Sequence, residues 1–357
     1  MQMIGVEDRI LREPWELAER EALLHSRWLA VPGGEDLVLG FFSDGLLVAT
    51  GSLVGNVLQG IAVAHEFEGE GLASTVVSAL LKRALDARME HIFLYTKPEE
   101  APRFESLGFV VLAAARSRST GLAAALLEWG GEGITKWKDG LRSFSKGRPE
   151  AAGAVVVNCN PFTVGHRRLI EWASRESPWL YVLVVQEDRS VFPFETRIRL
   201  VREGTRDLDN VSVLPGGPYV ISSATFPTYF TRMKAGESAI TELHALLDLE
   251  LFRQHIAPPL RVRTRFVGTE PYCPVTSVYN ETMKSTLPGG DGGVQVRELP
   301  RFALHGEAVS ASRVRALLRE GRINEVKQLV PAATWDWLHS EEAGPVLEKI
   351  RMNEGRH

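Results

Sequence analysis

The stretch that decides the fold runs from Ala154 to Ser174 and reads AVVVNCNPFTVGHRRLIEWAS. Its first four residues are apolar and predict a buried strand, and residues 165–175 carry apolar side chains at helical spacing. Between them lies a polar loop that contains Pro161. A strand that passes through such a loop into a helix predicts one unit of a parallel sheet, with a ligand site at the carboxyl end of the strand.

The same loop has the features of an anion-binding site. Backbone N–H groups at a helix N-terminus and the positive end of the helix dipole attract negative charge. Gly165 lets a phosphate approach the backbone, while Thr163 and His166 add a hydroxyl and an imidazole. Such donors suit the charge that develops on an α-phosphate during in-line displacement. For these residues taken alone, a helix-start glycine beside a structural histidine is the alternative.

Strands and helices alternate through the rest of the second half. A helix is expected at 194–203, and further strands are expected at 180–185, 211–214, 263–267 and 294–299. This alternation predicts an α/β fold with a doubly wound, Rossmann-like parallel sheet.

The pattern changes near residue 130. The first half predicts strands at 37–42, 45–53, 57–63, 91–95 and 109–113, with helices at 71–87 and 99–106. A short basic helix follows, with Lys136, Lys138, Arg142, Lys146 and Arg148. We therefore expect an α/β domain over 1–130, a linker helix over 131–150, the doubly wound domain over 151–340 and a tail over 341–357.

The composition limits the class of protein. The chain has 357 residues, 44% of them hydrophobic and 24% charged, with a net charge of −4. These values exclude a disordered chain and give no reason to expect a nucleic-acid partner. Residues 45–64 lack charges, but their four glycines favour strands and turns over a membrane span. Two distant cysteines, Cys159 and Cys273, favour a reducing cytoplasm over a disulfide framework or thiolate metal site.

Two signatures resemble those of a known superfamily. Thr163, Gly165 and His166 resemble the first signature of the HIGH-motif nucleotidyltransferases, and VSASRVR at 309–315 resembles their second. Ser310 and Ser312 are candidate N-caps of a helix over 313–319, which would give a second anion-binding helix end.

The resemblance implies a site for ATP, with Mg²⁺ bound through the phosphates and no metal held by the protein. The catalytic residues it implies are Thr163, His166 and Arg315. The nucleotide-binding residues it implies are Asn160, Pro161, Phe162, Gly165, Gly268, Glu270, Ser310 and Ser312. For Gly268 and Glu270 an ordinary strand-end turn is the alternative. Relatives usually carry Gly-x-Phe where this chain has Val-Asn-Cys at 157–159, so no contact is assigned to that first position.

Longer segments resemble the citrate lyase ligase family: NPFTVGHR at 160–167, VFPFETR at 191–197 and ISSATFPTYF at 221–230. This resemblance implies ATP-dependent acetylation of a thiol through acetyl-adenylate. The acceptor would be the dephospho-coenzyme A-like prosthetic group on the acyl carrier protein subunit of citrate lyase, and acetate would be the acyl donor. Residues 222–230 are candidates for an acetate or thiol-arm pocket, with simple packing as the alternative. Arg197 is interpreted as a solvated charge and Cys159 as a buried filler.

The first half resembles the GNAT acetyltransferases at 66–73 and 103–109. Three acids, Glu66, Glu68 and Glu70, lie where such enzymes hold pyrophosphate, so repulsion argues against tight coenzyme A binding. Three alternatives remain open: a cofactor-making adenylyltransferase of the phosphopantetheine type, a GNAT N-acetyltransferase and a non-catalytic binding protein.

Overall fold

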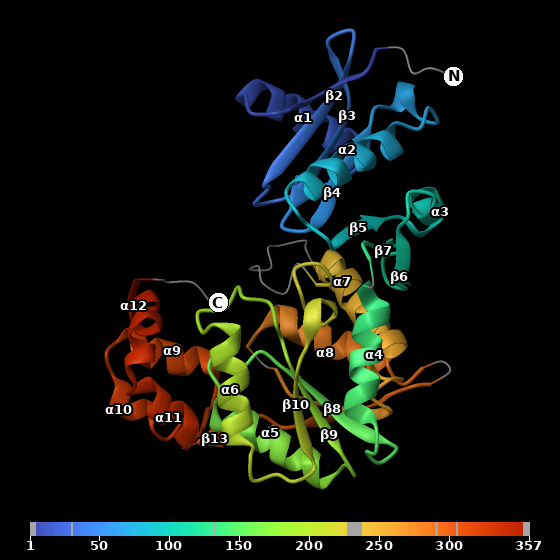
Figure 1. Cartoon of the computed structure of the whole chain (residues 1–357). Helices are drawn as coiled ribbons and strands as arrows, with labels where there is room; N and C mark the ends of the chain where they lie inside the picture. Colours follow the sequence, from blue (N-terminus) through green and yellow to red (C-terminus); the bar gives the residue numbers. More distant parts are fainter. Residues whose placement is uncertain are drawn as a thin grey trace. The chain divides into compact units, whose positions relative to one another are not determined.

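The computed structural model describes residues 5–29, 31–131, 133–226, 238–270, 272–289, 292–304 and 306–352. The chain divides into two compact units (Figure 1). Unit 1 comprises residues 1–115 and 123–133, and unit 2 comprises residues 116–122 and 134–357. The main part of unit 2 begins inside the 131–150 segment for which the sequence predicts a linker helix, and unit 2 also includes residues 116–122 of the predicted first domain.

Unit 1 is built on a seven-stranded sheet in the order β1-β2-β3-β4-β5-β7-β6. Strands β1 to β4 form an antiparallel meander, and β4 pairs with β5 in parallel. Its elements are β1 Glu7–Ile10, α1 Pro14–Ser26, β2 Leu37–Ser43, β3 Leu46–Val54, β4 Val57–Val63, α2 Leu72–Asp86, β5 Ile92–Thr96, α3 Ala101–Glu105, β6 Val110–Arg116 and β7 Ala123–Trp129. The predicted strands and helices of this half are confirmed, while β1, α1 and β7 were not predicted.

The acidic loop before α2 is balanced in part by basic side chains of the same unit. Gly71, in the left-handed region at φ 82°, is the N-cap of α2. Glu68 forms an ion pair with Arg27 and lies 3.4 Å from His65. Glu66 and Glu70 stay exposed, so the loop keeps a negative character.

Unit 2 contains a five-stranded sheet in the order β10-β9-β8-β11-β12, and its four strand pairs are all parallel. Its elements are α4 Gly133–Ser145, β8 Ala152–Val157, α5 Val164–Arg175, β9 Leu180–Val184, α6 Phe194–Gly204, β10 Val211–Pro215, α7 Ser238–Leu251, β11 Val262–Gly268, α8 Pro274–Thr286, β12 Gln295–Leu299, β13 Ala303–Leu304, β14 Glu307–Ala308, α9 Ala311–Arg319, α10 Ile323–Val326, α11 Ala332–Leu338 and α12 Gly344–Met352. The expected α/β class with a parallel sheet is confirmed.

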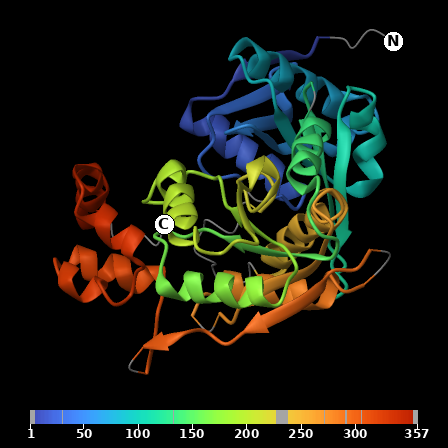
Figure 2. The ribbon, with the colours of Figure 1, turned by 60° about the horizontal axis from the view of Figure 1, so that its bottom comes forward.

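Side chains alternate between two cores on the two faces of this sheet. Val155, Val182 and Phe266 enter the core formed with α5, α6 and the C-terminal helices. Ala154 and Tyr181 enter the core formed with α4, α7 and α8. Figures 1 and 2 show the C-terminal group α9 to α12, in red, beside α6. Both faces are therefore covered, as a buried parallel sheet requires.

The direction in which the chain adds strands to the sheet changes between β8 and β11. From β8 the chain continues to β9 and β10 on one side, and then returns to place β11 and β12 on the other. In open parallel sheets, ligands bind beyond the carboxyl ends of the strands at such a switch point. The loop after β8 therefore lies where a ligand site is expected. No helix in the described part of the chain is long and apolar enough to cross a membrane.

Candidate active site

The N-terminus of α5 is closed by a reciprocal cap between Thr163 and His166. The backbone N–H of Thr163 donates to His166 Nδ1 at 3.1 Å, and the backbone N–H of His166 donates to Thr163 Oγ1 at 3.4 Å. The hydroxyl of Thr163 also lies 2.9 Å from Nδ1. Because Nδ1 accepts a hydrogen bond, the ring proton of the neutral histidine lies on Nε2. The cap therefore leaves Nε2–H as the donor that His166 can offer to a ligand.

His166 is neutral at physiological pH. Burial, and secondarily the positive charge of Arg301, lower the pKa of His166 from 6.5 to about 4. A neutral ring that donates from Nε2 can stabilise developing negative charge without first losing a proton.

The loop between β8 and α5 is held by buried contacts. Asn160 Oδ1 accepts from the backbone N–H of Phe192 at 3.1 Å, while Asn160 Nδ2 is buried with no partner among the described residues. Phe162 lies in the core, and its carbonyl accepts from the Thr334 hydroxyl at 3.0 Å. The Phe162 ring stacks on His166 with centroids 6.1 Å apart. The loop thus presents Asn160 Nδ2 as an unsatisfied donor, a feature that a phosphate oxygen would satisfy.

Arg197 is the main anchor of this loop, and its interpretation as a solvated charge was wrong. The side chain is fully buried on α6. It donates to the carbonyls of Phe192 (2.9 Å), Asn158 (3.0 Å), Val185 (2.6 Å) and Glu187 (2.9 Å). Arg197 therefore fixes the ends of β8 and β9 rather than binding a ligand.

A second helix N-terminus meets the first. Ser310 caps α9, and its Oγ accepts from the backbone N–H of Arg313 at 3.1 Å. Arg315 is buried and donates from Nη1 to the Asn160 carbonyl and from Nη2 to Ser312 Oγ at 3.5 Å. A Cβ atom on Gly165 would lie only 3.2 Å from the carbonyl oxygen of Val309. Two positive helix ends are therefore packed together.

The third wall comes from the ends of β11 and β12. Glu270 Oε1 accepts from the backbone N–H groups of Tyr272 and Cys273 at 3.0 and 3.1 Å. The same oxygen pairs with Arg301 Nη1 at 2.8 Å. The Arg301 backbone N–H donates to Thr269 Oγ1 at 2.9 Å. Glu270 thus orients an arginine.

These three walls enclose one cavity of about 240 Å³. Nine of the predicted site residues line it: Asn160, Thr163, Gly165, His166, Gly268, Glu270, Ser310, Ser312 and Arg315. Pro161 and Phe162 do not line it. Pro161 follows a cis peptide bond and is buried, and Phe162 supports the His166 ring from the core.

Sequence reasoning did not assign Arg301, Thr276 or Asn158, which also line the cavity. Arg301 follows a predicted strand at 294–299, so its place at the carboxyl edge of the sheet was a signal that could have found it. Cys159 also lines the cavity. Burial raises the pKa of its thiol strongly, so the thiol stays protonated and is a poor nucleophile.

The segment 221–226 is packed rather than open to this cavity. Thr225 Oγ1 donates to the buried Asp248 at 2.8 Å, and Phe226 stacks on Tyr279 with centroids 5.2 Å apart. Burial raises the pKa of Asp248. Residues 227–230, part of the candidate acetate or thiol-arm segment, lie outside the described residues.

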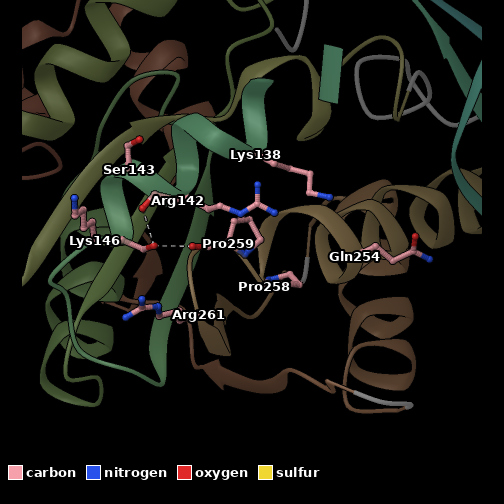
Figure 3. Close-up of a pocket in the computed structure, with 9 residues that line it drawn as sticks. Lys138, Arg142, Ser143, Lys146, Gln254, Pro258, Pro259 and Arg261 are labelled. Atoms are coloured by element: carbon pink, nitrogen blue, oxygen red, sulfur yellow. Dashed lines mark hydrogen bonds between the residues drawn. The ribbon is translucent and has the colours of Figure 1, made fainter. Parts of the chain in front are cut away.

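A second cavity of unit 2, of about 590 Å³, is basic (Figure 3). Lys138 and Arg142 of α4 line it together with Lys146, which follows the helix, and Arg261. Pro258 and Pro259 also line this cavity, and the carbonyl of Pro259 accepts from the buried Ser145 hydroxyl at 2.7 Å. Among the residues that the structure describes, no group of three His, Cys, Asp or Glu side chains is placed to hold a metal ion.

Known proteins resemble this chain over most of its length. The family model described as the citrate lyase ligase C-terminal domain matches residues 152–338. The citrate (pro-3S)-lyase ligase of Klebsiella pneumoniae is 41% identical over 295 residues, which is 82% of this chain and 83% of the relative. The protein of that name from Escherichia coli strain K12 is 35% identical over 328 residues, 91% of each chain.

Solved structures resemble a smaller part. Escherichia coli ElaA matches 36% of this chain and 99% of its own, at 13% identity and a TM-score of 0.32. The ribosomal-protein-S18-alanine N-acetyltransferase of Escherichia coli matches 36% of this chain and 98% of its own, at 16% identity and a TM-score of 0.31. On the family model and the full-length relatives, this chain belongs to the citrate lyase ligase family, a family of enzymes.

Proposed function

We propose that this chain is an acid–thiol ligase that uses ATP and acetate to acetylate a thiol on citrate lyase. The acceptor is the dephospho-coenzyme A-like prosthetic group of the acyl carrier protein subunit, and the intermediate is acetyl-adenylate. Acetylation of that thiol activates citrate lyase. The family of the chain supports this assignment, and the two free, buried cysteines suit a cytoplasmic enzyme.

One observation carries the ATP-dependent part of the proposal. The N-termini of α5 and α9 meet at one cavity, where Gly165 packs against the carbonyl of Val309. Each helix end has unpaired backbone donors and a partial positive charge. Two such ends suit a triphosphate, with one for the reacting phosphate and one for the departing pyrophosphate.

In the first step an acetate oxygen bonds to the α-phosphorus, and the bond from that phosphorus to the bridging oxygen of pyrophosphate breaks. Thr163, Gly165 and His166 bind the α-phosphate, with His166 donating from Nε2. Asn160 Nδ2 offers one more donor beside them. Ser310, Ser312 and Arg315 bind the pyrophosphate. This donor set suits anions rather than a cation, so Mg²⁺ would be bound through the phosphates and would supply charge neutralisation there.

In the second step the thiol sulfur bonds to the carbonyl carbon, and AMP leaves with the oxygen that acetate supplied. The thiol gives up its proton, so the products are a thioester, AMP and a proton. Gly268 leaves space at this edge, because the nearest atom to a Cβ placed there is the Leu299 carbonyl oxygen at 4.0 Å. We assign that space to the nucleoside.

The assay is acetate-dependent exchange of labelled pyrophosphate into ATP, which reports the first step alone. We expect His166→Ala to lower the exchange rate by about 10² to 10³, the usual effect of removing one donor to developing charge. His339→Ala is the matched control, because His339 is exposed and contacts the Trp335 carbonyl at 2.9 Å. If a folded His166→Ala protein exchanged pyrophosphate at the wild-type rate, the assignment of His166 to the α-phosphate would be wrong.

The same assay separates the alternatives. A panel of small carboxylates should give exchange with acetate, whereas an adenylyltransferase of the phosphopantetheine type would need phosphopantetheine and no carboxylate. A GNAT N-acetyltransferase would transfer acetyl from acetyl-coenzyme A to an amine without ATP. Exposed Glu66 and Glu70 disfavour that reaction.

We further assign the docking of the carrier protein to the basic cavity of Figure 3. Arg142 pairs with Asp139 and Arg261 with Glu150, whereas Lys138 and Lys146 have no carboxylate partner among the described residues. Carrier proteins are commonly acidic, so a cavity with unpaired lysines offers charge complementarity.

Charge reversal tests this docking site. Lys138→Glu combined with Lys146→Glu should raise the KM for the carrier protein several-fold and leave acetate-dependent exchange unchanged. Lys349→Glu on α12 is the control, because Lys349 is exposed and lies outside this cavity. An unchanged KM for the carrier protein in the double variant would remove the cavity from the proposal.

A further inference from the structure

The catalytic cavity contains two fixed positive charges among the described residues that line it, Arg301 and Arg315. Arg315 is 6% exposed and bonds to the loop carbonyl of Asn160 and to Ser312. Arg301 is different, because it lines the cavity and a quarter of its side chain is exposed. Arg301 belongs to neither of the two superfamily signatures in the sequence.

Arg301 is held firmly at one edge. Its backbone N–H is fixed by Thr269, and Nη1 pairs with Glu270 at 2.8 Å. Glu270 is itself fixed by the backbone N–H groups of Tyr272 and Cys273. The described residues offer no hydrogen-bond acceptor to Nε or Nη2 of Arg301. The guanidinium group of Arg301, which one carboxylate holds at Nη1, therefore has Nε and Nη2 available in its plane to donate to a ligand.

Two such donors match a carboxylate. Guanidinium binds carboxylate through two parallel N–H···O bonds, and this geometry gives both affinity and orientation. The field of Arg301 also reaches the ring proposed to hold the α-phosphate, because it lowers the pKa of His166. A first step between acetate and ATP brings two anions together, so a cation beside His166 is needed to offset their repulsion.

We propose that Arg301 binds the carboxylate of the acyl substrate, and that Glu270 and Thr269 hold it in place. This rests on the proposed function. One acetate oxygen attacks the α-phosphorus while the other stays on Arg301 and becomes the carbonyl oxygen of the acyl phosphate. When the thiol attacks that carbonyl carbon, negative charge develops on the same oxygen. Arg301 therefore serves both steps.

The experiment measures the KM for acetate and the KM for ATP in the exchange assay, using the full chain. Arg301→Gln should raise the KM for acetate about ten- to a hundredfold, the range for a lost charge-assisted hydrogen bond. The KM for ATP should change less than about threefold. The KM for acetate of Arg301→Lys should lie between those of the wild type and Arg301→Gln, because lysine keeps the charge and loses the planar pair of donors. Raising the acetate concentration should restore exchange in both variants.

Arg297→Gln is the matched control. Arg297 lies on β12, four residues before Arg301, and pairs with Glu176 away from the cavity. An unchanged KM for acetate in Arg301→Gln, or an equal or larger rise in the KM for ATP, would overturn the inference and make Arg301 a phosphate ligand or a structural residue. Failure of the wild-type chain to support acetate-dependent exchange would instead overturn the proposed function.

Discussion

Gly165→Ala tests whether the close approach of α5 and α9 builds the site. The added Cβ would lie 3.2 Å from the Val309 carbonyl oxygen and 3.5 Å from Thr163 Oγ1. The first distance is a few tenths of an ångström too short, and its partner is backbone that cannot rotate away. The two helix ends must therefore move apart slightly.

The magnitude follows from two opposing effects. Alanine favours a helix over glycine by about 0.8–1 kcal/mol, whereas overpacking costs about 1–3 kcal/mol. Compared with a glycine-to-alanine change in a helix that causes no clash, Gly165→Ala should therefore lower the free energy of unfolding by about 1–3 kcal/mol more, which is the overpacking cost. Since misplacement by about 1 Å can cost about 10² in rate, a few tenths should slow exchange about three- to tenfold.

Gly140→Ala is the matched control. Gly140 lies in α4, and a Cβ there would meet no atom within 4 Å. It should gain helix stability and keep wild-type exchange. Urea unfolding and acetate-dependent exchange are measured on both variants. If Gly165→Ala matched Gly140→Ala in stability and the wild type in exchange, the reasoning about the helix approach would be refuted.

Three further predictions concern buried and paired charges. Arg197→Met should lower the free energy of unfolding by at least about 3 kcal/mol, because several buried carbonyls lose a charged donor. The control Arg199→Gln, at an exposed position, should lower it by less than about 1 kcal/mol. Similar losses for the two variants in urea unfolding would contradict this prediction. The folded chain keeps His166 neutral down to about pH 4, while the unfolded chain protonates it near 6.5. The unfolding free energy should therefore fall as pH drops from 6.5 toward 4, and less steeply in His166→Asn; identical slopes would contradict the lowered pKa. Glu270→Gln should raise the KM for acetate less than Arg301→Gln does, because the substituted amide oxygen can still accept from Arg301 and Thr269 still holds its backbone, so that Arg301 is held less firmly but is still present. An effect on the KM for ATP alone would argue against that role.

The local chemistry of the site was readable in the sequence. The strand before Asn158 and the cap at Ser310 each depend on neighbours within a few residues, so spacing alone predicts them. The cap at Thr163 was not predicted, because Thr163 was assigned only as a phosphate-binding hydroxyl. The parallel sheet followed from the same alternation of strands and helices.

The features that sequence missed depend on long-range packing. Strand β7 reads AAALLEW, which favours a helix, and its extended form comes from pairing with β5, where Leu127 is aligned with Leu94. Arg197 and Arg199 look alike on α6, yet the first is fully buried and the second pairs with Glu342 at the surface. Which arginine faces the loop is decided by the helix position over β8 and β9.

The contacts that close the site join distant parts of the chain. Arg315 reaches the carbonyl of Asn160 across 155 residues, and Thr334 reaches that of Phe162 across 172. Contacts between residues so far apart in the sequence form late, because bringing them together costs the entropy of closing a long stretch of chain. A chain that ends before residue 309 would lack the second helix end and the contacts that hold the loop before α5. Catalytic activity should therefore emerge in refolding experiments with the final cooperative phase, and a C-terminal truncation should abolish it outright rather than reduce it by degrees.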